Sequence, residues 1–482
     1  MKILFCSAEV APFAKVGGLA DVAGSLPKAL SALGHEVIVA MPAYGMVVND
    51  PRWGFQKTKS EVLVKVNSSR LVRAELWEAE FDGIKFWLVD GEETFAKVTK
   101  SQEVYAPLRD DYLFFSHAIL EMCTEREWLP DVVSAHDWHM GFLPVIIKET
   151  RRGDWDSVAS TFTIHNLAYQ GEFGYDTLAA AGVPGSLFTW DALETYGGVN
   201  FLKSGCVFAD QVNTVSPNYS KEIQRPEYGC RLEGLMAWLA AEGRLEGILN
   251  GIDVDVFDPS ADPAIAAKYS VDDLSGKLEC RRALCTKAGL SVADDKPVMG
   301  VVSRLSNQKG FDLIIEAAPE FLARGAALIV LGTGDPWAAS ELRKLEASNP
   351  GLVKFFEAFD VDMAQRIYSG SDVFLMPSSF EPCGLGQMFA MRYGTVPVVR
   401  KTGGLADTVF EGENGFVFEE RSVAALSSAI ARAIEAFAEP TTWSKFVHAG
   451  MTQDFGWTKS AQAYLKMYRR AMDARRLKDM AS

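Results

Sequence analysis

The sequence has little of what disulfide scaffolds, membrane spans and surfaces for anionic partners require. Its seven cysteines are an odd number with irregular spacing and no CxxC pair, in a chain of 482 residues. This pattern argues against a disulfide framework, a zinc ribbon or a redox dithiol, and it favours a reducing cytoplasm. No uncharged apolar run approaches the length of about 18 residues that a membrane span needs. The apolar start at residues 3–6 is followed closely by Glu9 and is too short for the core of a signal peptide.

Positive charge is also scarce. The 48 Lys and Arg residues face 63 Asp and Glu residues, which gives a net charge of −15. Nucleic acids and anionic membranes are negatively charged, so the chain is a poor general binder of either. Any phosphate group that it binds must be held by local cations and backbone N–H groups. The remaining composition is that of an ordinary globular protein, and the length fits two large domains.

Short apolar runs alternate with stretches of helical periodicity along the chain. This alternation is typical of parallel sheets covered on both faces, so we expect an α/β fold with two doubly wound halves that join near residues 251–260. The strands expected in the first half are 3–6, 37–41, 86–89, 132–135 and 161–164. Those expected in the second half are 298–302, 327–331, 353–356, 373–376, 396–399 and 415–418.

The stretch 61–89 departs from this alternation. Three runs, 61–66, 71–80 and 84–89, are separated only by turn residues at 67–69 and 82–83. Such closely spaced runs predict a hairpin or meander inserted into the first half. Ligands of doubly wound folds bind at the carboxyl ends of the strands, so we expect the site in a deep crevice between the two halves.

The first candidate motif, KVGGLADV at residues 15–22, directly follows the first expected strand. Two glycines let the backbone approach a ligand closely, and the start of the helix expected near Leu19 offers N–H groups to a phosphate. Lys15 would add a full positive charge. An ordinary turn between strand and helix is the alternative. The nicotinamide fingerprint GxGxxG is absent at this position.

Histidines mark the ends of two further strands. His136, Asp137 and His139 follow one strand, and His165 follows the next. A carboxylate beside the aromatic side chain of Trp138 suits sugar hydroxyls, and a neutral imidazole suits a substrate hydroxyl; a satisfied buried histidine is the alternative. Histidines three residues apart at a strand end rarely converge on a metal, so we do not expect a metal site.

The second half offers a cationic loop and a glycine-rich helix start. Arg304 and Lys309 follow the first strand of this half and fit the two charges of a diphosphate. Glu381 precedes Cys383-Gly384-Leu385-Gly386, whose glycines leave backbone N–H groups uncovered. A carboxylate beside a phosphate site suggests sugar hydroxyls as its partner. Residues 401–407, KTGGLAD, resemble the first motif and differ from residues 15–21 at one position.

Together these motifs indicate a nucleotide diphosphate bound between two domains. Neither a P-loop nor a DxD cluster at a strand end is found, so phosphoryl transfer with a bound metal is disfavoured. The ordered segments KVGGLADV, HDWH, TIHNLAYQG, ILNGID, FEPCGL and YGTVPVVRKTGGLADTV resemble those of bacterial glycogen synthase and plant starch synthase. These enzymes form glycosyltransferase family 5 and are retaining glucosyltransferases of the GT-B type, with two Rossmann-like domains facing a deep cleft.

The resemblance implies a metal-independent transfer without a cofactor. Glucose would pass from ADP-glucose to the non-reducing 4-OH of an α-1,4-glucan such as glycogen, by a front-face mechanism. It also implies that the last helix returns to the first domain. The N-terminal, acceptor-side domain would then comprise residues 1–253 plus 455–482, and the nucleotide-sugar domain residues 254–454.

The resemblance also assigns roles residue by residue. The catalytic residues would be His165, Arg304, Lys309 and Glu381. The donor would be bound by Lys15, Gly17, Gly18, Asn250, Phe359, Cys383, Gly384, Leu385 and Gly386. The acceptor would be bound by Glu9, Asp137 and Asn166.

Some positions depart from the family pattern. Ser379 stands where the family usually has Arg, Gly386 where it has a larger residue, and Phe359 where the base-stacking aromatic is often Tyr. These departures leave the choice between ADP-glucose and UDP-glucose open. A non-catalytic glucan-binding homologue, or a sugar-nucleotide transferase with another acceptor, are the remaining alternatives. A glucan phosphorylase would need a pyridoxal phosphate lysine motif, which is not recognisable.

Overall fold

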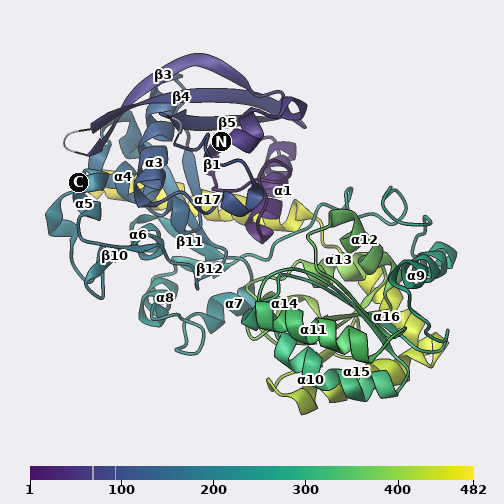
Figure 1. Cartoon of the computed structure of the whole chain (residues 1–482). Coiled ribbons are helices and arrows are strands. Elements are labelled where there is room, and N and C mark those ends of the chain that lie inside the picture. The colour runs from purple at the N-terminus through teal and green to yellow at the C-terminus, as the bar shows by residue number, and fades with distance from the viewer. Residues whose placement is uncertain (68–69, 93, 482) are drawn as a thin grey trace. The chain divides into compact units, whose positions relative to one another are not determined.

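The computed structural model describes residues 1–67, 70–92 and 94–481, and it divides the chain into two compact units. Unit 1 comprises residues 1–251 and 457–482, and unit 2 comprises residues 252–456. Each boundary lies within two residues of the one that the family resemblance implies. Figure 1 shows the two units in different parts of the colour scale, with the last helix, in yellow, belonging to the purple and blue unit 1.

Unit 1 is built on a nine-stranded sheet with the order β12-β11-β7-β6-β1-β2-β5-β4-β3. Its strands are β1 (Lys2–Cys6), β2 (Glu36–Pro42), β3 (Gln56–Asn67), β4 (Arg70–Phe81), β5 (Ile84–Gly91), β6 (Val132–His136), β7 (Ala159–Ile164), β11 (Gln211–Thr214) and β12 (Leu245–Gly247). The apolar runs that predicted strands are buried, because helices cover both faces of a parallel sheet.

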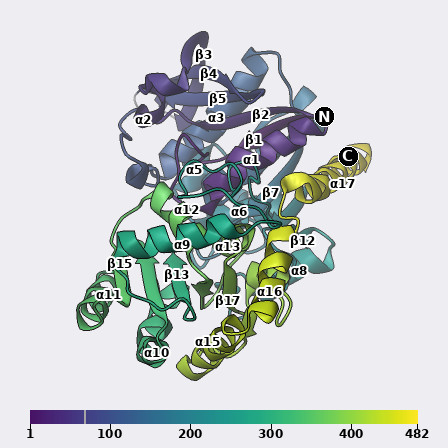
Figure 2. The same cartoon turned by 90° about the vertical axis from the view of Figure 1, so that its right-hand side faces the viewer.

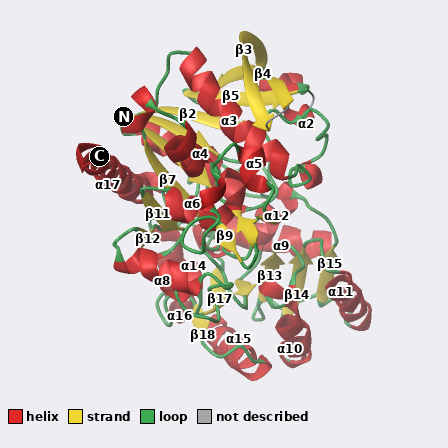
Figure 3. Ribbon diagram, turned by 90° about the vertical axis from the view of Figure 1, so that its left-hand side faces the viewer, coloured by secondary structure: helices red, strands yellow, loops and turns green. Residues whose placement is uncertain are grey.

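The predicted antiparallel insertion is present. β3 pairs with β4 and β4 with β5, both antiparallel, while β5 joins β2 in parallel and so extends the main sheet. The turn expected at 82–83 connects β4 to β5, whereas residues 68 and 69 of the turn expected at 67–69 lie outside the described residues. Figure 3 shows β3, β4 and β5 as neighbouring yellow strands.

Helices cover this sheet. The longer ones are α1 (Gly18–Ala32), α3 (Arg109–Glu125), α4 (Leu143–Thr150), α6 (Phe201–Phe208), α8 (Glu233–Ala241) and α17 (Trp457–Ala481). The shorter ones are α2 (Gly45–Val48), α5 (Thr177–Ala181) and α7 (Pro217–Glu222). α17 packs on α1, β7, β11 and β6, so the end of the chain contributes to the core of unit 1 (Figure 1). A small sheet, β8 (Glu172–Phe173), β10 (Gly198–Asn200) and β9 (Glu194–Thr195), completes the unit.

Unit 2 contains a parallel sheet with the order β15-β14-β13-β16-β17-β18. Its strands are β13 (Val298–Val302), β14 (Ala327–Leu331), β15 (Val353–Phe356), β16 (Val373–Met376), β17 (Val396–Arg400) and β18 (Phe416–Phe418). The first four coincide with the predicted ranges. Its helices are α9 (Ser275–Ala288), α10 (Phe311–Ala323), α11 (Pro336–Ser348), α12 (Val361–Gly370), α13 (Gly386–Arg392), α14 (Gly403–Thr408), α15 (Val423–Phe437) and α16 (Pro440–Thr452). Figure 2 shows α15 and α16 in yellow-green and yellow within this unit.

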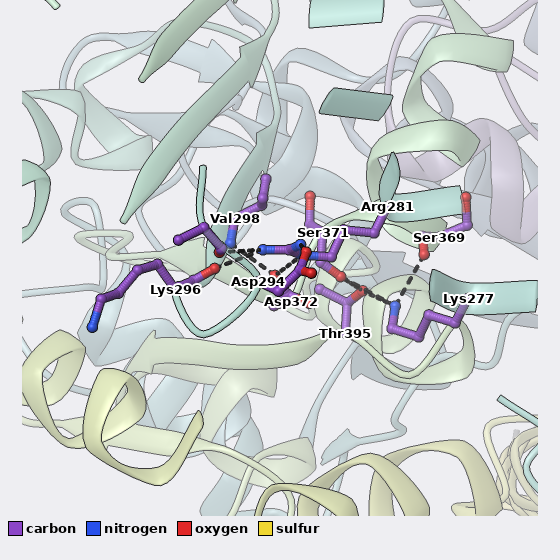
Figure 4. A network of polar contacts seen from close by, with 10 residues as sticks. Lys277, Arg281, Asp294, Lys296, Val298, Ser369, Ser371, Asp372 and Thr395 are labelled. Atoms are coloured by element: carbon purple, nitrogen blue, oxygen red, sulfur yellow. Dashed lines mark hydrogen bonds and ion pairs between the residues drawn. The ribbon is translucent and has the colours of Figure 1, made fainter. Parts of the chain in front are cut away.

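Two buried cations attach α9 to the sheet of unit 2 (Figure 4). The ammonium of Lys277 donates to the carbonyl oxygens of Ser369, Ser371 and Tyr393 and to the hydroxyl of Thr395, at 2.9–3.1 Å. The guanidinium of Arg281 contacts the Asp372 carboxylate at 2.9 Å. Burial lowers the pKa of Lys277 to about 8. These contacts satisfy the buried charges, and they explain why a helix with a polar sequence packs tightly.

Candidate active site

The loop after β1 is organised around a buried carboxylate. Glu9 has no exposed surface, and its Oε2 accepts hydrogen bonds from the backbone N–H of Val16 (2.5 Å) and Gly17 (3.0 Å). The hydroxyl of Tyr105 donates to Oε1 of Glu9 at 2.7 Å. Burial raises the pKa of Glu9. The N–H of Gly17, the residue before the first residue of α1, is therefore occupied, and Glu9 shapes the glycine loop from within.

Lys15 is held by a residue of its own motif. Its ammonium lies 2.6 Å from Oδ1 of Asp21, which sits in the first turn of α1. The side chain of Lys15 keeps 35% of its surface exposed, so the cation stays near the protein surface. The motif thus contains its own counter-ion. Sequence reading included Asp21 in the motif and gave it no role.

Asp137 joins the two motifs expected at the ends of β6 and β7. Its Oδ1 accepts from the backbone N–H of His165 (2.8 Å) and of Asn166 (3.4 Å). Its own backbone has φ of 58° and ψ of 175°, a region populated almost only by glycine. Burial raises the pKa of Asp137 to about 7. A strained residue that orients the following strand end is a feature of functional sites.

Two of the histidines expected at strand ends, His136 and His165, are in direct contact at this edge of the sheet. Nε2 of His165 lies 2.9 Å from Nδ1 of His136, and the His136 ring stacks on Phe5 with centroids 4.0 Å apart. Burial lowers the pKa of His165 to about 3, and that of His136 well below its ordinary value. Both rings are therefore neutral near pH 7.

His139 is buried between aromatic rings. It lies between Trp138 and Tyr105, with ring centroids 4.1 and 4.9 Å away. Within the described part of the chain, neither of its ring nitrogens has a hydrogen-bond partner. Within residues 1–67, 70–92 and 94–481, no three His, Cys, Asp or Glu side chains cluster in a way that could hold a metal ion.

Asn250 stands at the end of unit 1 with an unused polar atom. Its side chain is 6% exposed, and its Oδ1 is buried without a hydrogen-bond partner among the described residues. A buried polar atom that lacks a partner costs free energy, and such atoms are retained where a ligand supplies the missing contact. This geometry is compatible with the donor-side role that the resemblance implies.

In unit 2 the cationic loop and the acidic motif meet directly. The ammonium of Lys309 donates to Oε2 of Glu381 at 2.6 Å, and the hydroxyl of Ser378 donates to the same oxygen at 2.9 Å. Because β13 and β16 are parallel neighbours, their carboxyl ends place the two loops side by side. Arg304, at the end of β13, is exposed. Ser378 was missed by sequence analysis, because nothing in its context distinguishes it from a loop serine.

The glycines of the second GGLAD segment, residues 403–407, allow close packing against the backbone that follows β16. A Cβ atom on Gly403 would lie 1.7 Å from the carbonyl oxygen of Glu381, and one on Gly404 would lie 2.1 Å from that of Cys383. Gly404 also donates its N–H to the Glu381 carbonyl at 3.1 Å. The two glycines therefore let α14 pack closely against the backbone that carries Glu381. The two motifs are similar in sequence, but their glycines make different contacts.

The remaining predicted donor residues occupy two environments. Phe359, between β15 and α12, is 70% exposed, as a side chain that stacks on a ligand would be. Cys383 is buried, and Gly384 adopts φ of 72° at the turn that leads into α13, which begins at Gly386.

Comparison with known proteins identifies the family. Residues 2–238 match the family described as starch synthase catalytic domain, and residues 286–446 match glycosyl transferases group 1. The glycogen synthase of Desulforudis audaxviator is 43% identical, over 98% of this chain and 97% of its own. That of Thermotoga petrophila is 40% identical, over 98% of this chain and 99% of its own.

Similarity to solved structures supports the family assignment and identifies the fold. The catalytic domain of starch synthase IV from Arabidopsis thaliana, bound to ADP and acarbose, has a TM-score of 0.91 and 32% identity, covering 98% of this chain and 99% of that chain. Sucrose-phosphate synthase from Thermosynechococcus elongatus, with 18% identity and a TM-score of 0.62, shares the fold. Among the described residues, no helix has the length and apolarity needed to cross a membrane. The chain therefore belongs to the glycogen synthase and starch synthase family of glucosyltransferases, and it has the GT-B fold.

Proposed function

We propose that this protein is a glycogen synthase that transfers glucose from ADP-glucose to the non-reducing 4-OH of an α-1,4-glucan, with retention of configuration. The names of its relatives and the ADP bound to the Arabidopsis structure support this reading. The observation that carries it is the contact between Lys309 and Glu381. In a nucleotide sugar, the phosphates lie next to the sugar hydroxyls. The cation of Lys309 would bind the phosphates, and the adjacent carboxylate of Glu381 would bind the hydroxyls.

The residues of unit 2 would act on the leaving group. Arg304 and Lys309 would neutralise the negative charge that grows on the diphosphate. When no metal ion assists, this charge is the largest electrostatic demand of the step. The buried Glu381 would accept hydrogen bonds from the glucosyl hydroxyls. The exposed ring of Phe359 would stack on the base, and the backbone N–H groups of Cys383 to Gly386 would hold the sugar and distal phosphate.

The residues of unit 1 would act on the transferred sugar and the acceptor. His165 is neutral near pH 7, because burial lowers its pKa, so its ring adds no repulsion to a sugar carbon that becomes positive. Its carbonyl oxygen would lie near that carbon, and Asn250 would help to position the glucosyl unit. Unit 1 would also reach the phosphate side of the donor: Lys15 would supply charge there, and Gly17 and Gly18 would let the backbone approach closely, with the N–H of Gly17 bonded to Glu9.

The chemistry balances without a nucleophile from the protein. The bond between C1 and the phosphate oxygen breaks, and the bond from C1 to O4 of the acceptor forms on the same face of the sugar. The proton of the acceptor hydroxyl passes to an oxygen of the departing diphosphate. This front-face route retains configuration without the carboxylate nucleophile that retention commonly uses. A trapped glucosyl ester of the enzyme would contradict it. Asp137, Glu9 and Asn166 would line the acceptor side.

The test is incorporation of labelled glucose into glycogen, with ADP-glucose and UDP-glucose compared in parallel and with EDTA present. We expect strong incorporation from ADP-glucose that EDTA does not reduce. Preference for UDP-glucose would overturn the donor assignment and leave the transfer intact. Loss of activity with EDTA would overturn the metal-independent mechanism. Absence of incorporation from either donor, with glycogen still bound, would favour a glucan-binding homologue.

A further inference from the structure

A buried hydrogen-bonded chain runs from the C-terminal helix to the predicted catalytic histidine. The hydroxyl of Tyr468, on α17, donates to Oγ of Ser134 at 3.0 Å. Oγ of Ser134 lies 3.0 Å from Nε2 of His136, and Nδ1 of His136 lies 2.9 Å from Nε2 of His165. Tyr468, Ser134 and His136 have no exposed surface, and His165 keeps 9%. All four residues belong to unit 1.

The direction of each hydrogen bond follows from counting donors. Tyr468 has one O–H, and among the described residues its hydroxyl has one hydrogen-bond partner, so its proton must point at Ser134 or remain buried without an acceptor. An unsatisfied buried donor is costly, so Tyr468 donates. The hydroxyl of Ser134 then has its own proton free for its other partner, Nε2 of His136.

The same count fixes both imidazole tautomers. A neutral imidazole carries one N–H, and Nε2 of His136 accepts, so Nδ1 of His136 carries the proton and donates to Nε2 of His165. Nε2 of His165 is thereby an acceptor, and its proton resides on Nδ1. That nitrogen bonds no other described residue. It is the polar atom that the His165 ring can offer to a substrate.

We propose that His136, oriented by Ser134 and Tyr468, is a positioning residue that holds His165 as the neutral Nδ1–H tautomer, with this N–H directed to a hydroxyl oxygen of the transferred sugar. The inference deepens the proposed function and rests on it for the identity of the sugar. Asp137 complements the chain, because it fixes the backbone N–H of His165 while His136 fixes the ring. Burial keeps both rings neutral, which the alternation of donors and acceptors requires.

The direct test is the nitrogen NMR spectrum of the full-length protein labelled with ¹⁵N-histidine near pH 7. Only six histidines are present, and His165→Gln and His136→Asn assign the two signals. We expect both imidazoles to show a protonated, pyrrole-type Nδ1 and an unprotonated, pyridine-type Nε2. A His165 ring protonated on Nε2, or on both nitrogens, would overturn the proposal. This readout does not depend on turnover, so it decides the tautomer even if the proposed glucosyl transfer is refuted.

The kinetic test separates positioning from packing. His136→Leu removes the donor to His165 and should lower kcat on the order of tenfold, the effect of one hydrogen bond, with KM for the donor sugar little changed. His136→Asn places an amide N–H near the position of Nδ1 and should recover most of that loss. Equal kcat values in the two variants would overturn the positioning role.

Two tyrosines one helical turn apart on α17 provide a matched pair. Tyr468→Phe removes the first donor of the chain and should lower kcat by on the order of threefold. Tyr464→Phe removes a hydroxyl that contacts Nδ2 of Asn213 instead of Ser134, from an equally buried ring. It should leave kcat and the histidine spectrum unchanged. An equal effect of the two variants would contradict the chain. If His136→Leu fails to fold, the two tyrosine variants and the wild-type histidine spectrum still test whether the chain positions His165.

Discussion

Lys309 and Glu381 form an ion pair of 2.6 Å between side chains that are 18% and 7% exposed. They lie 72 residues apart in sequence and come from loops that follow neighbouring parallel strands. In the proposed reaction, each partner faces a different part of the donor, so the pair would connect the sugar to the leaving group. Removing either partner leaves the other charge buried and uncompensated, so this contact is the most direct place to test the site.

Glu381→Gln should lower kcat by orders of magnitude and leave ADP binding nearly intact. The amide keeps the shape and can still accept from Ser378, while the charged acceptor for sugar hydroxyls is lost. Lys309 stays available to the phosphates. Steady-state kinetics and calorimetric titration with ADP measure the two effects. Normal turnover in this variant would refute the sugar-side role of Glu381.

Arg304→Ala should cost about 3 kcal/mol of transition-state stabilisation, comparable to the loss of one oxyanion donor. Arg304 is exposed at the end of β13, so its removal should hardly change folding stability. Arg324→Ala is the control, because Arg324 is an exposed arginine of the same unit whose i,i+4 pair with Glu320 contributes little. kcat/KM for the donor is the measurement. A loss confined to glucan affinity would overturn the leaving-group assignment.

Gly403→Ala should destabilise unit 2 by more than about 2 kcal/mol and abolish transfer, although Gly403 is not assigned a substrate contact. The new methyl group would meet the backbone carbonyl of Glu381 at a position where φ is 45°. The control is Gly412→Ala, whose φ is 75° and whose surroundings are open within 4 Å. It should cost about 1 kcal/mol from backbone strain alone. Urea unfolding compares the two, and similar losses would contradict the close approach.

The strands of unit 2 illustrate what the sequence predicts well. β13 to β16 coincide with the predicted ranges, because a strand buried on both faces reads as a short apolar run between polar turns. The sequence also places histidines at the ends of β6 and β7, which are parallel neighbours and share one carboxyl edge.

Long-range side-chain contacts could not be predicted in this way. The contact between Tyr468 and Ser134 joins residues 334 positions apart, and neither position carries a signal of its own. The hydrogen bond from the N–H of Gly17 to the carboxylate of Glu9 could not be predicted either. That outcome depends on how the loop turns back on itself, which residue types alone do not determine. The different roles of the two GGLAD segments likewise depend on the backbone that their glycines contact, which the residue types do not specify.

Asp137 should make folding stability depend on pH in a window that Asp137→Asn removes. Its pKa is raised from its ordinary value of 3.8 to about 7, chiefly by burial and with a smaller contribution from the charge of Glu9. Between these values the folded state binds more protons than the unfolded state, so stability falls as pH rises from about 4 to 7. Three pH units correspond to a loss on the order of 4 kcal/mol.

The difference in unfolding free energy between wild type and Asp137→Asn isolates this effect from other titrating groups. The asparagine retains an oxygen that can accept from the N–H groups of His165 and Asn166, and it carries no charge at any pH. Urea unfolding of both proteins at pH 4.5, 5.5 and 6.5 measures the difference. We expect wild type to lose stability relative to the variant at each step. A constant difference would mean that the folded state does not raise the pKa of Asp137 within this range, and it would contradict the prediction.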